Sequence, residues 1–265
     1  MYDFAYSKPT SLDGARSAIA GAGDGKLMAG GMTLIPTLKQ RLASPSDLID
    51  LSGAGDLVGI SVDGSTVTIG AMTTHGTVAA SDDVKKAIPA LAALADNIGD
   101  AQVRHRGTIG GSIANNDPAA DYPAGCIALG ATIVTNTREI AADDFFVGLF
   151  ETPLEEDEVI TAVRFPVAKR AAYMKFPNPA SRYALVGVFV ADTDSGVRVA
   201  VTGAGQDGVF RVPDMESALS GNFTADAIDG ISVADDDLNT DIHASAEYRA
   251  HLITVMAKRA VAAAG

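Results

Sequence analysis

This 265-residue sequence has a single cysteine, no tryptophan and fewer basic than acidic residues. One thiol cannot hold an iron–sulfur cluster, which typically takes about four cysteine ligands, or a structural zinc site built on cysteines. Cys126 stands in the apolar stretch 124–129, so we expect it to be buried and inert. The four histidines lack the i,i+4 spacing of a metal site. Any redox centre in this chain must therefore be an organic cofactor, and we expect no metal ligands.

Basic residues and long apolar runs are also scarce. A net charge of −13 leaves no clustered Lys and Arg to neutralise phosphates, which argues against a nucleic-acid partner. No run approaches the ~18 apolar residues of a membrane span. The first residues lack the basic and apolar regions of a secretory signal. We therefore expect a globular, cytoplasmic protein without a membrane span.

The order of strand and helix signals predicts three domains. In residues 1–52, strands at 2–6, 26–29 and 48–51 alternate with helices that begin near Ser11 and Leu34, as in a small βαβαβ lobe with a parallel sheet. Residues 53–167 predict a larger α+β lobe, with a hairpin at Asp63-Gly64, an alanine-rich helix at 88–98 and a solvated acidic turn at 155–158. Residues 168–265 predict antiparallel strands at 186–191 and 197–202 and a last helix at 246–263.

One literal dinucleotide motif is rejected. Residues 203–208 match G-x-G-x-x-G after an apolar strand. A Rossmann site needs a helix to open at the third glycine, so that its N-terminus faces the pyrophosphate. Here the chain continues as Val-Phe-Arg-Val-Pro, which is extended and ends in proline. We interpret the segment as a hairpin or a turn at a strand end.

Two glycine pairs carry the functional signal. Gly30-Gly31 is followed by Thr33, and Gly110-Gly111 is followed by Ser112; each pair stands beside a predicted strand end. Glycine lets another group approach the backbone closely, and exposed N–H groups form anion sites. A single pair would be an ordinary glycine turn, but two such loops suit one long ligand with a diphosphate, held between two lobes. The sequence therefore favours a flavin nucleotide domain.

The longer segments around these pairs resemble a known family. Residues 29–36, Arg106 to Ser112 and the run Asp117-Pro-Ala-Ala-Asp121-Tyr-Pro are similar to the FAD-binding medium subunits of molybdenum hydroxylases, a group that includes the carbon monoxide dehydrogenase medium chain and the flavin domain of xanthine dehydrogenase. Residues 173–175, 180–184 and 247–252 extend the resemblance over essentially the whole chain. Met32 departs from the pattern, since many relatives have a polar residue there.

The resemblance implies a fold and a set of binding residues. The fold class is α+β: a two-lobed FAD-binding fold of the PCMH or vanillyl-alcohol-oxidase type, with a C-terminal antiparallel sheet plus helices. Asp121 would hold a polar group on the adenosine side, Lys175 would favour a reduced anionic flavin, and Tyr183 would cover the isoalloxazine ring. The residues expected to bind FAD, non-covalently, are Leu27, Met28, Ala29, Gly30, Gly31, Met32, Thr33, Leu34, Thr108, Ile109, Gly110, Gly111, Ser112, Asp121, Ile160, Lys175 and Tyr183. No catalytic residue is expected.

The resemblance also implies partners. A large chain would carry the molybdenum cofactor and oxidise the substrate, a small chain would carry two [2Fe–2S] clusters, and this chain would pass electrons from FAD to an external acceptor, in a dimer of heterotrimers. Two alternatives stay open: a stand-alone flavin-dependent oxidoreductase of the same superfamily, and a scaffold that has lost its flavin. The substrate and the acceptor (quinone, NAD or oxygen) cannot be read from this chain.

Overall fold

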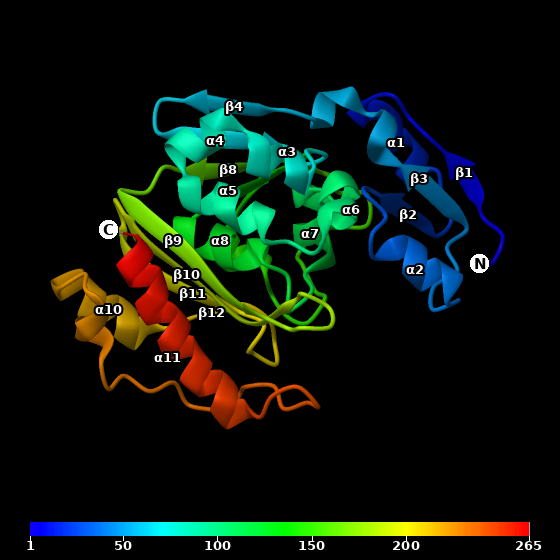
Figure 1. Ribbon diagram of the computed structural model, residues 1–265. Helices are drawn as coiled ribbons and strands as arrows, with labels where there is room; N and C mark the ends of the chain where they lie inside the picture. Colours follow the sequence, from blue (N-terminus) through cyan, green and yellow to red (C-terminus); the bar gives the residue numbers. More distant parts are fainter. Residues whose placement is uncertain (265) are drawn as a thin grey trace.

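The computed structural model describes residues 1–264 and contains three β-sheets (Figure 1). The first is the parallel sheet of the N-terminal lobe, in the order β1-β3-β2. Two helices connect its strands, as the predicted βαβαβ pattern requires. The elements are β1 (Ala5–Ser7), α1 (Leu12–Ala20), β2 (Gly25–Met28), α2 (Leu34–Lys39) and β3 (Asp47–Asp50), followed by the short 3₁₀ turns η1 (Leu51–Gly53) and η2 (Gly55–Leu57).

The second sheet is antiparallel, with five strands in the order β4-β5-β8-β6-β7. Its strands are β4 (Ile60–Asp63), β5 (Thr66–Gly70), β6 (Thr132–Thr135), β7 (Glu139–Ala141) and β8 (Ile160–Pro166). The chain between β5 and β6 is helical: α3 (His75–Ala80), α4 (Asp82–Ala87), α5 (Pro89–Asp96), α6 (Ala101–Arg106), α7 (Ile109–Asn115) and α8 (Tyr122–Leu129), with α9 (Ala142–Phe145) after β7.

The third sheet has four antiparallel strands in the order β12-β11-β10-β9. Its elements are β9 (Arg170–Pro177), β10 (Ala184–Thr193), β11 (Gly196–Thr202), β12 (Phe210–Arg211), α10 (Pro213–Gly221), the 3₁₀ turn η3 (Ala225–Ile228) and α11 (Ala246–Ala263). Helix α11 crosses one face of this sheet, and α5 and α8 pack on the other (Figure 1). Because both faces are covered, nearly every residue of β10 is buried.

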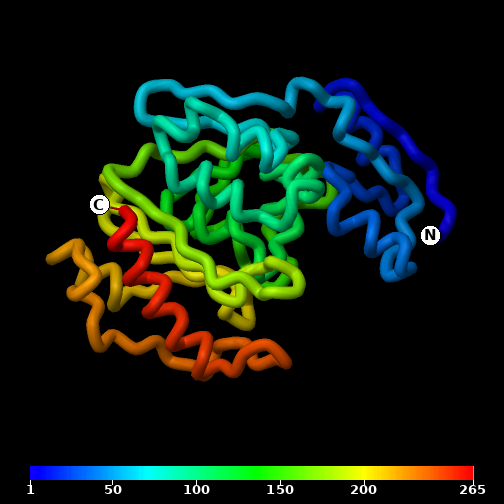
Figure 2. The backbone as a smooth tube through the Cα atoms, in the orientation of Figure 1, coloured from blue at the N-terminus to red at the C-terminus, as the bar shows by residue number. Residues whose placement is uncertain are grey.

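The tube view shows the N-terminal lobe set apart from the rest of the chain, while the second and third sheets lie close together (Figure 2). One apolar core explains this proximity, since it joins residues of the helical segment, such as Leu91 and Leu94, to Phe189 and Tyr173 of the third sheet. A separate core lies under α11. No helix within residues 1–264 is long and apolar enough to cross a membrane.

Local sequence signals account for several of these elements. Helix α1 begins where the Ser11 hydroxyl accepts a hydrogen bond from the Gly14 N–H, which satisfies one of the free donors of the first turn. The predicted hairpin at Asp63-Gly64 is present, with Gly64 at a φ of 56° that favours glycine. The last helix occupies the predicted residues 246–263.

The segment 203–208 has the predicted non-Rossmann structure. It follows β11 and leads into β12, which pairs antiparallel with β11, and no helix opens at Gly208. Strand β9 and helix α10 were not predicted, and the first strand is shorter than predicted, at residues 5–7. The fold class is confirmed as α+β with a C-terminal antiparallel sheet and helices. Of the third predicted range, 168–265, the final residue lies outside the described part of the chain.

Candidate functional site

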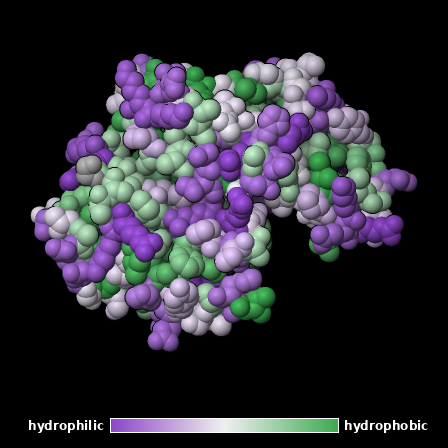
Figure 3. Space-filling view, viewed as in Figure 1, coloured by the Kyte–Doolittle hydropathy of each residue, from purple (hydrophilic) through white to green (hydrophobic). Residues whose placement is uncertain are grey.

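A cavity of about 630 Å³ lies where the N-terminal lobe, the helical segment and a loop of the third sheet meet. Its volume is within the range of roughly 300–1,000 Å³ typical of ligand sites. The space-filling view shows an indentation of the surface between the N-terminal lobe and the rest of the molecule (Figure 3). Both glycine pairs line this cavity, so two segments about 80 positions apart in the chain form one site.

The first glycine pair follows β2 and leads into α2. Gly31 has a φ of 73°, a conformation that glycine adopts without strain. A side chain at Gly30 would collide with the backbone carbonyl of Arg106, at the end of α6. The absence of a side chain at Gly30 therefore lets the N-terminal lobe pack directly against the helical segment. This packing role adds to the predicted one, in which the missing side chain leaves space for a ligand.

The sequence predicted a loop at the second glycine pair, but this pair lies in the first turn of α7. The Thr108 hydroxyl caps this helix by accepting a hydrogen bond from the Gly111 N–H at 3.1 Å. A Cβ on Gly110 would lie 2.6 Å from the Cβ of Ala71, and one on Gly111 would lie 3.0 Å from the Cβ of Ala29. Two glycines disfavour a helix in isolation, but the cap and this close packing outweigh that preference.

Unpaired backbone donors mark the wall formed by the first glycine pair. Within residues 1–264, the N–H groups of residues 30–33 donate no hydrogen bond, although the residues line the cavity. Backbone N–H groups that have no partner within the protein bind water or a ligand. Together with the hydroxyls of Thr33 and Ser112, they form a donor-rich wall suited to the oxygens of a diphosphate. The residues present therefore fit the pyrophosphate of FAD.

Asp121 lines another part of the wall and holds a buried ion pair. Its carboxylate accepts hydrogen bonds from the Lys175 ammonium at 3.0 Å and from the Tyr173 hydroxyl. Lys175 also donates to the carbonyl of Asn97 at 3.0 Å and does not line the cavity. Burial raises the pKa of Asp121, and the positive charge of Lys175 opposes that rise. Lys175 therefore lies behind Asp121, and its expected role beside the flavin stays a prediction.

Tyr183 reaches the cavity on the loop between β9 and β10. The Asn178 side chain shapes this loop by accepting hydrogen bonds from the N–H groups of Ala180 and Ser181. The Asn178 N–H closes the loop by donating to the Tyr183 carbonyl at 2.8 Å. The Tyr183 side chain stays 46% exposed, so its ring is available to a ligand rather than packed in the core.

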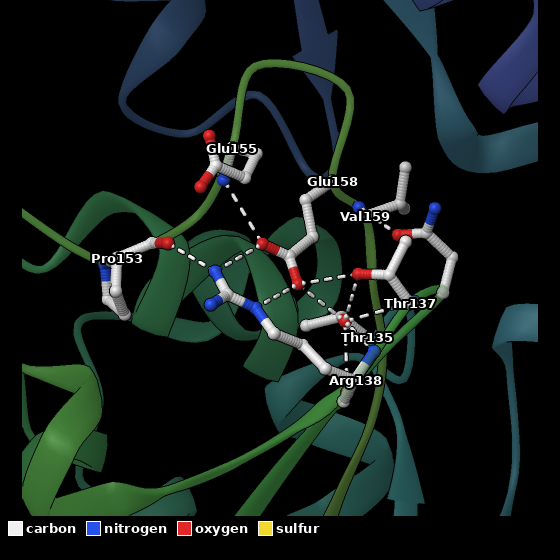
Figure 4. A network of polar contacts seen from close by, with 8 residues as sticks. Thr135, Thr137, Arg138, Pro153, Glu155, Glu158 and Val159 are labelled. Carbon is white, nitrogen blue, oxygen red and sulfur yellow. Dashed lines mark hydrogen bonds and ion pairs between the residues drawn. The ribbon is translucent and has the colours of Figure 1, made fainter.

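A buried carboxylate beside the cavity was missed. The sequence predicted a solvated turn at 155–158, but the Glu158 side chain is only 1% exposed. It accepts two hydrogen bonds from Arg138 (2.9 and 2.8 Å) and others from the hydroxyls of Thr135 and Thr137 and the N–H of Glu155 (Figure 4). The Arg138 hydrogen bonds are the main reason that the pKa of Glu158 falls from 4.5 to about 2. This network fixes the turn before Ile160, on the cavity wall.

The structure brings most of the predicted binding residues to one cavity. Met28, Ile109 and Lys175 do not line it: Met28 and Ile109 are buried in apolar cores, and Lys175 lies behind Asp121. The predicted residues that do line it are Leu27, Ala29, Gly30, Gly31, Met32, Thr33, Leu34, Thr108, Gly110, Gly111, Ser112, Asp121, Ile160 and Tyr183. His75 also lines the cavity but was not predicted, because it is a lone histidine outside any motif. Cys126 is buried, as predicted, and burial raises the pKa of its thiol.

A family description matches residues 2–168, the part of the chain that holds the first two sheets: "FAD binding domain in molybdopterin dehydrogenase". The fold and the donor-lined cavity thus define an FAD-binding domain of an oxidoreductase.

Similar proteins extend this match over the whole chain. The nicotine 6-hydroxylase medium subunit of Paenarthrobacter nicotinovorans is 37% identical, covering 98% of this chain and 96% of its own length. The carbon monoxide dehydrogenase medium chain of Hydrogenophaga pseudoflava is 36% identical, with the same coverage. A solved structure of carbon monoxide dehydrogenase from H. pseudoflava, which lacks the Mo-pyranopterin moiety of the molybdenum cofactor, superposes with a TM-score of 0.88 at 38% identity, covering 98% of this chain and 96% of that chain. The chain belongs to the family of FAD-binding medium subunits of molybdenum hydroxylases.

Proposed function

We propose that this chain is the FAD-carrying electron-transfer subunit of a heterotrimeric molybdenum hydroxylase. It takes electrons from the [2Fe–2S] clusters of a small subunit and passes them to an external acceptor, while a large subunit with the molybdenum cofactor oxidises the substrate. The assembly is a dimer of such heterotrimers. The observation that carries the proposal is the cavity lined by hydrogen-bond donors. The one cysteine of the chain is buried, so the chain cannot hold an iron–sulfur cluster itself.

The residues of this chain bind and orient the cofactor. The N–H groups of residues 30–33 and the Ser112 hydroxyl hold the pyrophosphate, Asp121 holds a polar group on the adenosine side, and Tyr183 covers the flavin ring. FAD, when bound, supplies the redox chemistry, and the protein sets its position and surroundings. We propose no catalytic acid, base or nucleophile in this chain.

The remaining expectations concern the organisation of the chain and its complex. Each of the three sheets falls within one of the predicted ranges 1–52, 53–167 and 168–265, which we propose as the domains. A cytoplasmic location stays a prediction from the sequence. The substrate is bound by the large subunit, and the names of the relatives above, nicotine 6-hydroxylase and carbon monoxide dehydrogenase, indicate how widely substrates differ in this family.

Selective removal of FAD from the purified complex tests the proposal. We expect substrate to reduce the iron–sulfur clusters of the FAD-free complex, as followed by electron paramagnetic resonance, while reduction of the external acceptor stops. Adding FAD should restore acceptor reduction. Acceptor reduction at the original rate without FAD would refute the electron-transfer role. Substrate turnover by this chain and FAD alone would favour the stand-alone oxidoreductase instead.

A further inference from the structure

His75 is a buried histidine on the wall of the cavity. It is the first residue of α3 and only 4% exposed, and it lines the cavity, as Gly107 and Thr108 do. Its backbone N–H donates to the carbonyl of Gly107 at 2.9 Å, which ties α3 to the segment that precedes α7. The Tyr122 ring packs against the imidazole, with ring centroids 5.4 Å apart. The position of the imidazole is therefore fixed by its surroundings.

The hydrogen-bonding capacity of this imidazole is unused within residues 1–264. Its Nδ1 is buried and has no partner there, and Nε2 faces Gly107, where a Cβ would lie only 2.6 Å away. A buried polar group without a partner destabilises the folded state. Of the buried side-chain atoms that lack a partner, the imidazole is the one that belongs to a cavity-lining residue. The other ring nitrogen, Nε2, also makes no hydrogen bond within residues 1–264 and is not among those buried atoms, so a group in the cavity can serve as its partner.

The imidazole is uncharged at neutral pH, because burial and the nearby positive charge of Arg104 lower the pKa of His75 from 6.5 to about 4. A neutral imidazole has one N–H donor. A proton on Nδ1 would be buried without an acceptor, which is rare for N–H groups, so the proton belongs on Nε2. Other donors that line the same cavity are the backbone N–H groups of residues 30–33 and the Ser112 hydroxyl. Together these donors suit a ligand group rich in oxygen acceptors.

We propose that His75 is an FAD-binding residue, whose Nε2–H donates a hydrogen bond to an oxygen of the cofactor's pyrophosphate. The inference rests on the proposed function, since it requires FAD in this cavity. His75 adds a directional donor without adding a positive charge. It thereby complements the glycine segments, which hold the same group by backbone donors and contain no Lys or Arg.

Titration of the FAD-free full chain with FAD, followed by quenching of flavin fluorescence, tests the role of His75. In His75→Ala, loss of a hydrogen bond to a charged group, worth about 1.5–3 kcal/mol, should weaken FAD binding about 10- to 100-fold. His75→Gln places an amide N–H near the position of Nε2 and should bind FAD within about threefold of the wild type. Riboflavin, which has no phosphate, should bind both variants as it binds the wild type.

His105 provides the matched control, because it is exposed on α6 and does not line the cavity. His105→Ala should bind FAD as the wild type does. Unchanged FAD affinity in His75→Ala, an equal loss of FAD and riboflavin affinity, or no recovery in His75→Gln would each overturn the inference while leaving the proposed function intact. Absence of FAD binding by the wild-type chain would instead refute the proposed function, and the role of His75 with it.

Discussion

The network around Glu158 allows a quantitative prediction for Glu158→Gln. The substitution keeps the shape of the side chain but removes the charge that Arg138, Thr135 and Thr137 stabilise. The folded-state pKa of about 2, against an ordinary 4.5, corresponds to about 3 kcal/mol of stability at neutral pH. We therefore expect a loss of about 3 kcal/mol at pH 7.

The pH dependence of this loss identifies its origin. Because the folded-state pKa is lowered, the stabilisation is complete well above pH 4.5 and disappears as the pH falls through 4.5 toward 2. The difference in unfolding free energy between the wild type and Glu158→Gln should fall to about half by pH 3. Urea denaturation followed by circular dichroism at several pH values measures it. Glu156→Gln, in the same turn but exposed, should cost less than about 0.5 kcal/mol. A difference that is independent of pH, or below about 0.5 kcal/mol at pH 7, would refute the reasoning.

Three further outcomes follow from the cavity wall. Gly30→Ala should lower the free energy of unfolding by about 2–3 kcal/mol and weaken FAD binding, because its Cβ would collide with the backbone of Arg106. Gly55→Ala should change neither, because no atom lies within 4 Å of the position of its Cβ. Thermal unfolding and FAD titration compare the two variants. Because the pKa of His75 is lowered in the folded state, the folded state binds fewer protons than the unfolded state between pH 4 and 6.5. The free energy of unfolding should therefore fall by up to about 3 kcal/mol as the pH is lowered over that range, and His75→Gln should lack this loss. Equal losses in both proteins would contradict the lowered pKa of His75. Tyr183→Ala should alter the rates of flavin reduction or reoxidation more than FAD affinity, since the ring is half-exposed on a loop; stopped-flow absorbance measures the rates, and unchanged rates would leave Tyr183 without a role at the flavin.

The sequence predicted best those features that depend on neighbouring residues. The Ser11 cap of α1 and the Asp63-Gly64 hairpin are local signals, and both are present. The helix at Gly110-Gly111 was not predicted, because its stability comes from the Thr108 cap and from close packing on Ala71. Intrinsic preference opposes a helix there, and only the tertiary structure supplies the compensation.

The same reason separates the predicted part of the site from the missed part. The two glycine segments could be recognised as one site because each has its own pattern. Glu158 could not, because a run of four acidic residues is ordinarily solvated, and its partner Arg138 is 20 positions away. The ion pair of Lys175 with Asp121, a cavity-lining residue 54 positions earlier, could not be predicted for the same reason.

The loop between β9 and β10, which Asn178 shapes, determines how much of the chain is needed to form the cavity. The family match ends at residue 168, yet the loop of residues 178–183 forms part of the cavity wall. A fragment cut at the end of the matched region would lose Ala180 to Tyr183 from that wall and would expose Tyr122 and other apolar side chains that now share a core with the third sheet. The region matched by the family is therefore shorter than the region needed to form the cavity wall and the shared apolar core. A ligand that contacts the N-terminal lobe, the helices between β5 and β6 and the β9–β10 loop would also resist their separation, so cofactor loss should destabilise all three parts together.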